Sequence, residues 1–311
     1  MTINSHVTTF AGLPVVAFDP EGELPDDPAA VAWRVETEDF EAPPEEFAGL
    51  IEALITRVPE GQIRALVLGE WGSTYEVGPP IELLISLAPR LSGLRAIFVG
   101  DLTYEQCEIS WIHQGEITPL LTAYPELEVL RIRGAEGLVF EAAQHASLRE
   151  LGFESGGLPA QVVRAVGASD LPALQSLDLW LGTSNYGADS TVDDLAPILS
   201  GERLPSLRSL ALCNAEIADA VAAAVATAPV IARLDVLDLS KGELTDEGLD
   251  ALLAGQPLTH LSRLDLHHHY LSAEGQERLT AALPGVEIDL SEPRESDESD
   301  GRVFRYVSVG E

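Results

Sequence analysis

The 311-residue sequence has few cysteines, few basic residues and no long apolar run. Two cysteines, Cys107 and Cys213, cannot build the disulfide framework of a small secreted domain, which agrees with a reducing compartment. Because no run of about eighteen apolar residues occurs, we expect no membrane-spanning helix. The first residues, MTINSHVTTFAGLPVV, lack a basic segment followed by an apolar one. We therefore expect no secretory leader and a cytoplasmic location.

Basic residues are the scarcest charged class, since 18 Lys and Arg face 51 Asp and Glu and the net charge is −33. Lys241 is the single lysine. Such a surface repels phosphate backbones and anionic lipid, which excludes nucleic acid and membranes as expected partners. Two interpretations of the charge stay open at this point. It is either a solubilising surface shared with the rest of the host proteome or a means of steering a basic protein toward this one.

Motifs for catalysis and metal binding are scarce too. No phosphate-binding loop or glycine-rich dinucleotide fingerprint follows an expected strand. Cys107 and His113 lie in one insertion, but no orienting Asn or Asp is specified beside them. The side chains of His267–His269 alternate in direction on a strand, and Asp265 with His267 supplies only two of the three or four ligands of a zinc site. We therefore expect no enzyme, no catalytic residue, no cofactor and no metal.

What the sequence does contain is a repeat. LDVLDLSKGELTDEGLDALLAG begins at Leu234, and its Leu-x-x-Leu-x-Leu rhythm returns at Leu261 as LSRLDLHHHYLSAEGQERLTAALPG. The same spacing occurs upstream at intervals of 21 to 33 residues, and a weaker last unit follows. The central apolar residues of the nine units are Leu66, Ile97, Leu130, Leu151, Leu177, Leu210, Leu237, Leu264 and Ile288.

Each unit predicts one strand followed by one return segment, because alternate apolar side chains are typical of a half-buried strand. The return segments place apolar residues at three-to-four spacing, and most end near Pro or Gly, as helices do. They include residues 81–89, 117–125, 160–168, 192–201, 218–229, 246–255 and 274–285. One strand and one helix cannot bury their apolar faces alone, so the units are expected to stack into a solenoid.

This pattern resembles the leucine-rich-repeat proteins of the ribonuclease-inhibitor-like type. The sequence also resembles a bacterial family of stand-alone leucine-rich-repeat proteins without an assigned activity, including the ends FAGLPVVAF and RYVSVGE. The resemblance implies an α/β horseshoe with a concave parallel sheet and helices on the convex side. One departure concerns position 8 of the repeat, counted from 0 at its first leucine, where such proteins often carry Asn or Cys. Ala, Gly or His stands there instead, so the turns must satisfy their backbone groups in another way.

The organisation predicted is a capping region at residues 1–60, repeats at 61–290 and a C-terminal region at 291–311, all in one structural domain. The cap is expected to contain strands at 13–18 and 31–36 and a helix at 43–58. Residues 291–301 have the composition of a disordered charged loop. The following segment, RVFRYVSV, is expected to be an edge strand that shields the last repeat.

Positions 4 and 6 of each unit are expected to face outward from the concave sheet, because they alternate with the buried leucines. This surface begins apolar, turns basic and then becomes acidic. The candidate partner-binding residues on it are Arg131, Arg133, Glu154, Asp178, Trp180, Asp238, Asp265 and His267, with Trp180 as the expected exposed anchor. The alternative is a solvated sheet face on which Arg131 and Arg133 pair with Glu154.

Aromatic residues gather in the loops that follow the expected strands. Trp71 and Trp111 are the two rim residues counted among the candidate binding residues, because aromatic side chains concentrate at recognition surfaces. The alternative is that these side chains pack the loops against the solenoid. We expect a monomeric, non-catalytic module that binds a protein with a basic patch. The other hypothesis is a small-ligand receptor or enzyme whose pocket lies between the long loops after the first, second and fifth repeat strands.

Overall fold

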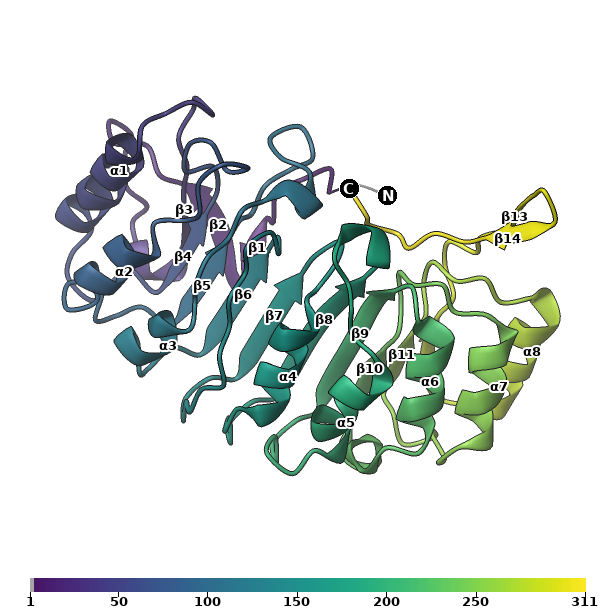
Figure 1. The fold of residues 1–311 in the computed structure, drawn as a ribbon. Coiled ribbons are helices and arrows are strands. Elements are labelled where there is room, and N and C mark those ends of the chain that lie inside the picture. Colours follow the sequence, from purple (N-terminus) through teal and green to yellow (C-terminus); the bar gives the residue numbers. More distant parts are fainter. Residues whose placement is uncertain (1–2) are drawn as a thin grey trace.

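A computed structural model describes residues 3–311 and confirms the predicted α/β solenoid (Figure 1). One 12-stranded sheet holds its strands in chain order; β1 pairs antiparallel with β2, and β2 to β12 are parallel. The strands are β1 (Thr9–Phe10), β2 (Leu13–Ala17), β3 (Ala32–Val35), β4 (Ala65–Leu68), β5 (Ala96–Val99), β6 (Val129–Arg133), β7 (Glu150–Glu154), β8 (Ser176–Gly182), β9 (Ser209–Ala215), β10 (Val236–Asp238), β11 (Arg263–Asp265) and β12 (Glu287–Asp289).

The register of this sheet follows the repeat residue by residue. Leu66 pairs with Ile97, and each later central residue pairs with the one in the next unit as far as Ile288. Trp33 of β3 extends the same row beyond the first repeat. The central side chains are buried in one continuous apolar core along the solenoid. The predicted spacing therefore gives both the strands and their alignment.

The helices cover the convex side of the sheet (Figure 1). They are α1 (Pro44–Arg57), α2 (Ile81–Leu87), α3 (Pro119–Ala123), α4 (Ala160–Ala168), α5 (Val192–Ser200), α6 (Ala218–Ala226), α7 (Asp246–Ala254) and α8 (Ala273–Ala282). The unit between β6 and β7 connects without a helix, because its 21-residue step is too short for one in addition to its loops. Across residues 3–311, no helix has the length and apolar character needed to cross a membrane.

Backbone hydrogen bonds between neighbouring units take the place of the Asn or Cys side chains that position 8 lacks. Asn214, Lys241 and His268 occupy the same place in three successive units, and all three adopt left-handed backbone angles, with φ of 53°, 66° and 55°. This conformation aims each backbone N–H at the following unit. Asn214 donates to the Ser240 carbonyl at 2.9 Å, and Lys241 donates to the His267 carbonyl at 2.8 Å. Backbone bonds between neighbouring turns therefore satisfy the rim.

The two strands and the helix expected near the N-terminus are present, since β2, β3 and α1 fall within the expected ranges. The expected C-terminal edge strand is wrong. Residues Arg302–Phe304 form β14, which pairs with β13 (Asp297–Ser299) in a separate hairpin, so the segment with the composition of disorder contributes a strand. The physical reason is that the chain after β12 rises to the rim, where the Arg294 N–H donates to the carbonyl of His269 at 2.8 Å.

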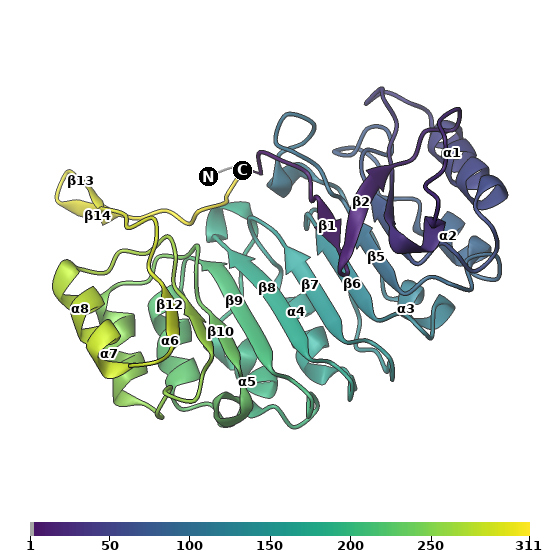
Figure 2. The ribbon, with the colours of Figure 1, turned by 180° about the vertical axis from the view of Figure 1, so that it is seen from behind.

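Beyond the hairpin, residues 305–311 run back along the rim at the carboxyl ends of the strands, as the yellow segment in Figures 1 and 2 shows. The N–H of Ser308 donates to the Lys241 carbonyl at 2.7 Å. The N–H of Val309 donates to the side-chain oxygen of Asn214 at 2.9 Å, and the Asn214 amide donates to the carbonyl of Val309 at 2.5 Å. Ser110 bonds the carbonyl of Gly310. This C-terminal strap joins the end of the chain to the second repeat.

Candidate functional site on the concave face

The N-terminal part of the concave face is closed to solvent. Val67 and Phe98, expected to face outward, are 0% exposed because the N-terminal segment folds over them. The ring of Phe10 lies 5.7 Å from that of Phe98, and Figure 2 shows β1 and β2 in front of the sheet. The expectation of an open apolar surface over the first repeats is therefore wrong. A few residues of chain, Val7 to Leu13, convert it into a second apolar cluster.

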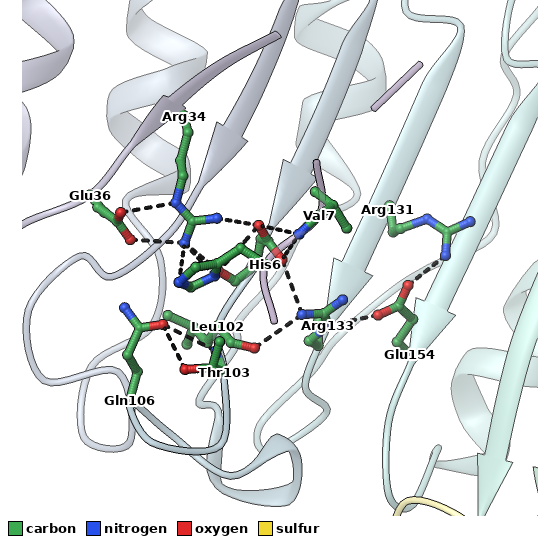
Figure 3. Close-up of polar contacts among 11 residues, drawn as sticks. His6, Val7, Arg34, Glu36, Leu102, Thr103, Gln106, Arg131, Arg133 and Glu154 are labelled. Atoms are coloured by element: carbon green, nitrogen blue, oxygen red, sulfur yellow. Dashed lines mark hydrogen bonds and ion pairs between the residues drawn. The ribbon is translucent and has the colours of Figure 1, made fainter. Parts of the chain in front are cut away.

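A buried ionic network fastens this segment to the sheet (Figure 3). At its centre Asp101, which follows β5, is 0% exposed. Its carboxylate accepts from Arg34 of β3 and, at 3.1 Å, from Arg133 of β6. The backbone N–H of Val7 donates to both of its oxygens at 3.3 Å. Arg34 also donates to Glu36 at 3.0 Å. Because each buried charge has an opposite charge in contact, the network is a structural clasp.

Arg131, Arg133 and Glu154 continue this network across β6 and β7. Glu154 accepts from Arg133 Nε at 2.7 Å and from Arg131 Nη1 at 2.5 Å. Burial acts to raise the pKa of Glu154, but the two arginines outweigh it and lower that pKa to about 2. Arg133 and Glu154 are each 4% exposed, so the expectation that they contact a partner is wrong. The alternative, pairing within the sheet, is confirmed.

Asp178 of β8 is the last carboxylate along the sheet that contacts an arginine of this network. Its Oδ2 accepts from Arg131 at 3.1 Å, while Oδ1 finds no hydrogen-bond partner in residues 3–311. Burial raises the pKa of Asp178 to about 6, against the opposing attraction of Arg131. One buried oxygen of this carboxylate therefore has no hydrogen-bond partner among the described residues.

Trp180, the expected exposed anchor, is instead buried, with 8% of its surface exposed. The Nζ atom of Lys241 lies 5.0 Å from the centre of its ring, in a cation–π contact that covers it. Lys241 reaches this place because its left-handed turn lies two strands away, after β10. The expectation that Trp180 is open to a partner is wrong, since the only lysine of the chain shields it.

Four aspartates form a row along the C-terminal half of the concave face. Asp178 pairs in register with Ala211, Ala211 with Asp238, Asp238 with Asp265, and Asp265 with Asp289. Adjacent strands lie about 4.8 Å apart, so these carboxylates stand much closer together than like charges prefer. Asp238 bonds the N–H of its neighbour Ser240 at 2.9 Å. The row is the acidic surface that the sequence predicts.

The row ends in a cluster of ligand-type side chains. Asp265 Oδ1 lies 2.7 Å from His267 Nδ1, and ligand atoms of Asp265, His267 and Asp289 all lie within 4.8 Å of one another. Arg263 donates to Asp265 Oδ2 at 2.8 Å and lies 3.5 Å from Asp289 Oδ2. The sequence indicates only Asp265 and His267 as a pair of ligands. Asp289 joins them in the structure, and it occupies the same repeat position as Asp265.

The rim aromatics divide into buried and exposed residues. Trp71 is 4% exposed and donates its Nε1–H to the carbonyl of Val77 at 2.9 Å, so it packs its own loop. Its expected contact with a partner is wrong. Trp111, in the short 3-10 helix η2 (Ile109–Trp111), is 59% exposed. Tyr75 and Tyr104 nearby are also exposed. Trp111 therefore keeps its place as a candidate contact residue.

One of the three long loops borders a groove on the rim. This groove of about 620 Å³ lies between the loop after β8 and the C-terminal strap, with Thr183, Tyr186, Glu216 and Glu243 among its lining residues. Burial raises the pKa of Glu243 to about 7. The groove thus uses only one of the three loops that the alternative hypothesis requires, and the strap supplies its other wall.

Cys107 and His113 do not form a nucleophile pair in this arrangement. The Cys107 thiol is buried and donates to the carbonyl of Glu108 at 3.6 Å. Burial raises its pKa, which disfavours the thiolate that a cysteine nucleophile needs. The His113 N–H donates to the carbonyl of Thr74 at 2.7 Å, and the ring packs beside Gly137. Both residues therefore hold the insertion together.

Comparison with solved structures finds a protein of Bacteroides fragilis, a structural genomics target, that shares 30% sequence identity with this chain. The two superpose with a TM-score of 0.74, over 84% of this chain and 75% of that protein. A leucine-rich-repeat protein of Leptospira interrogans matches at 17% identity and a TM-score of 0.37, over 76% of this chain and 56% of that one. An internalin of Listeria monocytogenes matches at 12% identity and a TM-score of 0.31, over 84% of this chain and 80% of that one. The last two are too distant to support an argument about function. No protein-family model and no curated protein matches the sequence.

Proposed function

This chain belongs to the same family of leucine-rich-repeat proteins as the Bacteroides fragilis protein, and on that premise we propose that it binds a basic protein without catalysing a reaction. The binding surface is the acidic row on the C-terminal half of the concave face. The observation that carries the proposal is the in-register alignment of Asp178, Asp238, Asp265 and Asp289.

The row has more negative charge than its neighbours neutralise. Arg131 contacts Asp178 at its inner end, and Arg263 contacts Asp265 and Asp289 at its outer end. Asp238 stands between them and bonds a backbone N–H. Like charges on adjacent strands destabilise a sheet unless a cation lies between them. A partner that brings lysine or arginine side chains therefore gains attraction and relieves this repulsion.

The spacing of the row favours a basic helix as the partner element. Asp238, Asp265 and Asp289 stand on successive strands ~4.8 Å apart, and Ala211 on the strand between leaves about twice that spacing between Asp178 and Asp238. Side chains three or four residues apart on a helix advance by about 4.5 to 6 Å along its axis, because the rise is about 1.5 Å per residue. A helix lying across the strands can therefore place one cation near each aspartate. An extended strand, with same-face side chains about 6.6 Å apart, loses the match within two steps.

The covered half of the concave face supports the same location. Val67 and Phe98 lie beneath the N-terminal segment, and Arg133 and Glu154 are consumed by their mutual ion pair. Asp178 has 20% and His267 has 21% of its side chain exposed, whereas Asp265 is buried, so it adds charge to the row and its expected direct contact with a partner is wrong. Trp111, on the rim, extends the surface toward the second repeat. We place the protein in the cytoplasm as a monomer, consistent with its two buried free thiols.

The test begins with a photo-crosslinkable residue at Ala211, inside the row, or at Val236, two residues before Asp238, in the intact protein expressed in its native host. Mass spectrometry then identifies any protein joined to it. The purified partner is titrated against wild type and Asp238→Lys at several salt concentrations. We expect at least tenfold weaker binding for the variant and a fall in affinity above about 0.15 M salt, since the charges are partly exposed.

Glu277→Lys, on the exposed face of α8, is the matched control, because it changes net charge by the same amount on the convex side. Equal loss of binding in Glu277→Lys and Asp238→Lys means that overall charge, and not the row, is recognised. A partner that binds Asp238→Lys as tightly as wild type rules out the acidic row as its site.

A further inference from the structure

We propose that Asp265, His267 and Asp289 bind a divalent transition-metal ion at the outer end of the concave face. The three side chains come from β11, the residue pair after it, and β12. Two carboxylate oxygens and one imidazole nitrogen form a donor set typical of zinc and of manganese, iron or cobalt in the divalent state. The proposal does not rest on the protein-binding function, although Asp265 and Asp289 also belong to the acidic row.

The geometry is close to what one ion requires. The candidate ligand atoms lie within 4.8 Å of one another. Two ligands of a zinc ion are at most about 4.2 Å apart, since each bond is about 2.1 Å long. Asp265 is fixed, with 9% of its side chain exposed, whereas 34% of the Asp289 side chain is exposed. A small rotation of Asp289 brings it within reach of one ion, which replaces the hydrogen bond between His267 Nδ1 and Asp265 Oδ1 at 2.7 Å, and water can be a further ligand on the solvent side.

Neighbouring groups already orient these ligands. Asp289 Oδ1 accepts from both the N–H and the hydroxyl of Ser291, at 2.9 and 2.6 Å, which leaves Oδ2 for the site. Asp265 Oδ1 accepts from the backbone N–H of His267 at 3.1 Å. Metal-ligating carboxylates are held by hydrogen bonds of this kind. Hydrogen bonds from Ser291 lower the pKa of Asp289. Burial acts to raise the pKa of Asp265, but hydrogen bonds from His267 and Arg263 outweigh it and lower that pKa.

Arg263 is the internal competitor for this site. Its guanidinium lies between Asp265 and Asp289, where it supplies positive charge to both. Its side chain is 41% exposed, and Glu287, which is 70% exposed, lies 3.3 Å away as another partner. An incoming ion can therefore displace the guanidinium toward Glu287 without leaving it unpaired. Removing Arg263 is expected to strengthen metal binding, which is the opposite of what its loss does to a purely structural ion pair.

The experiment titrates zinc chloride into the full-length protein at pH 7.5, in competition with a chromophoric chelator, and repeats the titration with cobalt to record ligand-field absorption. Nuclear magnetic resonance of the histidine rings identifies which imidazole responds. We expect one site that perturbs His267, with affinity at least tenfold lower in His267→Gln and in Asp289→Asn. We also expect tighter binding in Arg263→Gln, because the competing guanidinium is then absent.

Two controls separate this site from general binding to an acidic surface. His260→Gln removes a partly exposed ring that bonds the carbonyl of Ile231 at 2.8 Å, and Asp178→Asn removes a concave carboxylate outside the cluster. Both are expected to bind zinc like wild type. Thermal unfolding without metal checks that each variant folds. The proposal is overturned if His267→Gln and Asp289→Asn, both folded, bind zinc as tightly as wild type, or if the His267 resonances do not shift.

Discussion

Replacing Asn214 tests whether the C-terminal strap is held by one side chain. Asn214 is 0% exposed and lies near the end of β9. Its amide donates to the carbonyls of Val309 and Ser155, at 2.5 and 3.2 Å, and its oxygen accepts from the Val309 N–H at 2.9 Å. Asn214→Ala removes all three bonds and places alanine at a φ of 53°. Asn214→Gly removes the same bonds without the strain that a Cβ atom adds there.

The magnitude follows from these two contributions. Three hydrogen bonds contribute about 1 kcal/mol each to the free energy of unfolding. The left-handed backbone adds about 1 to 2 kcal/mol for alanine over glycine. The strap can detach, however, and water then satisfies the groups of Val309, so the bond loss cannot exceed the free energy with which the strap docks. We expect a loss of roughly 2 to 3 kcal/mol for Asn214→Gly, and about 1 kcal/mol more for Asn214→Ala.

Two measurements are needed to separate detachment from general destabilisation. Urea unfolding gives the free energy of each variant, and hydrogen exchange reports the protection of the Val309 amide. Exchange of Val309 should rise by at least about tenfold in both variants, while the central strand amides of β7 and β8 keep their protection. Asn185→Ala, at an exposed position on the same rim, is the control. If the Val309 amide keeps full protection in Asn214→Gly, the C-terminal strap is not held by the Asn214 side chain.

Three further predictions concern the core, the covered tryptophan and pH. Leu177→Ala and Leu210→Ala, both at 0% exposed sites, should each lower the free energy of unfolding by about 2 to 5 kcal/mol, and near-wild-type urea midpoints for both contradict the inward register. Trp180→Ala should lower the free energy of unfolding by about 3 kcal/mol, whereas Trp111→Ala, at a 59% exposed site, should change it by less than about 0.5 kcal/mol. Equal changes for the two variants contradict the difference in burial. Burial raises the pKa of Asp178 from 3.8 to about 6, so the folded state holds an extra proton in that interval and this carboxyl's contribution to stability falls as pH rises from about 4 to 6. Asp178→Asn should flatten the pH dependence of the urea midpoint there, and an unchanged slope contradicts the assignment.

The repeat made the architecture predictable because its rule is local. Each Leu-x-x-Leu-x-Leu specifies which side chains enter the core, and parallel stacking then fixes the neighbour, as the pairing of Leu177 with Leu210 illustrates. The same rule correctly placed Asp178, Asp238 and Asp265 on the concave face. It also gave Asp289 its place in the row, although the ligand count for a metal omitted that residue.

The rest was not predictable from the repeat, because it depends on segments outside it and on contacts between distant parts of the chain. Phe10 covers Phe98 across 88 residues of sequence, and Val309 reaches Asn214 across 95. Trp180 is covered by Lys241 only because the turn after β10 has a left-handed residue. Periodicity specifies the direction in which a side chain points. It does not specify which distant segment of the chain covers that side chain.

The two chain ends explain why only one part of the concave face is available. A solenoid leaves two surfaces that its repeats do not cover: the inner face of the sheet and the rim where the strands end. The N-terminal segment closes the inner face where it is apolar, around Phe98, and exposing that cluster to water is costly. The C-terminal strap covers the rim beside Asn214 and His268. Neither end covers the row from Asp178 to Asp289, because carboxylates are well hydrated and covering them requires a cation. Arg131 and Arg263 contact the two ends of the row, and with 18 basic residues against 51 acidic ones we expect any further cation to come from a partner.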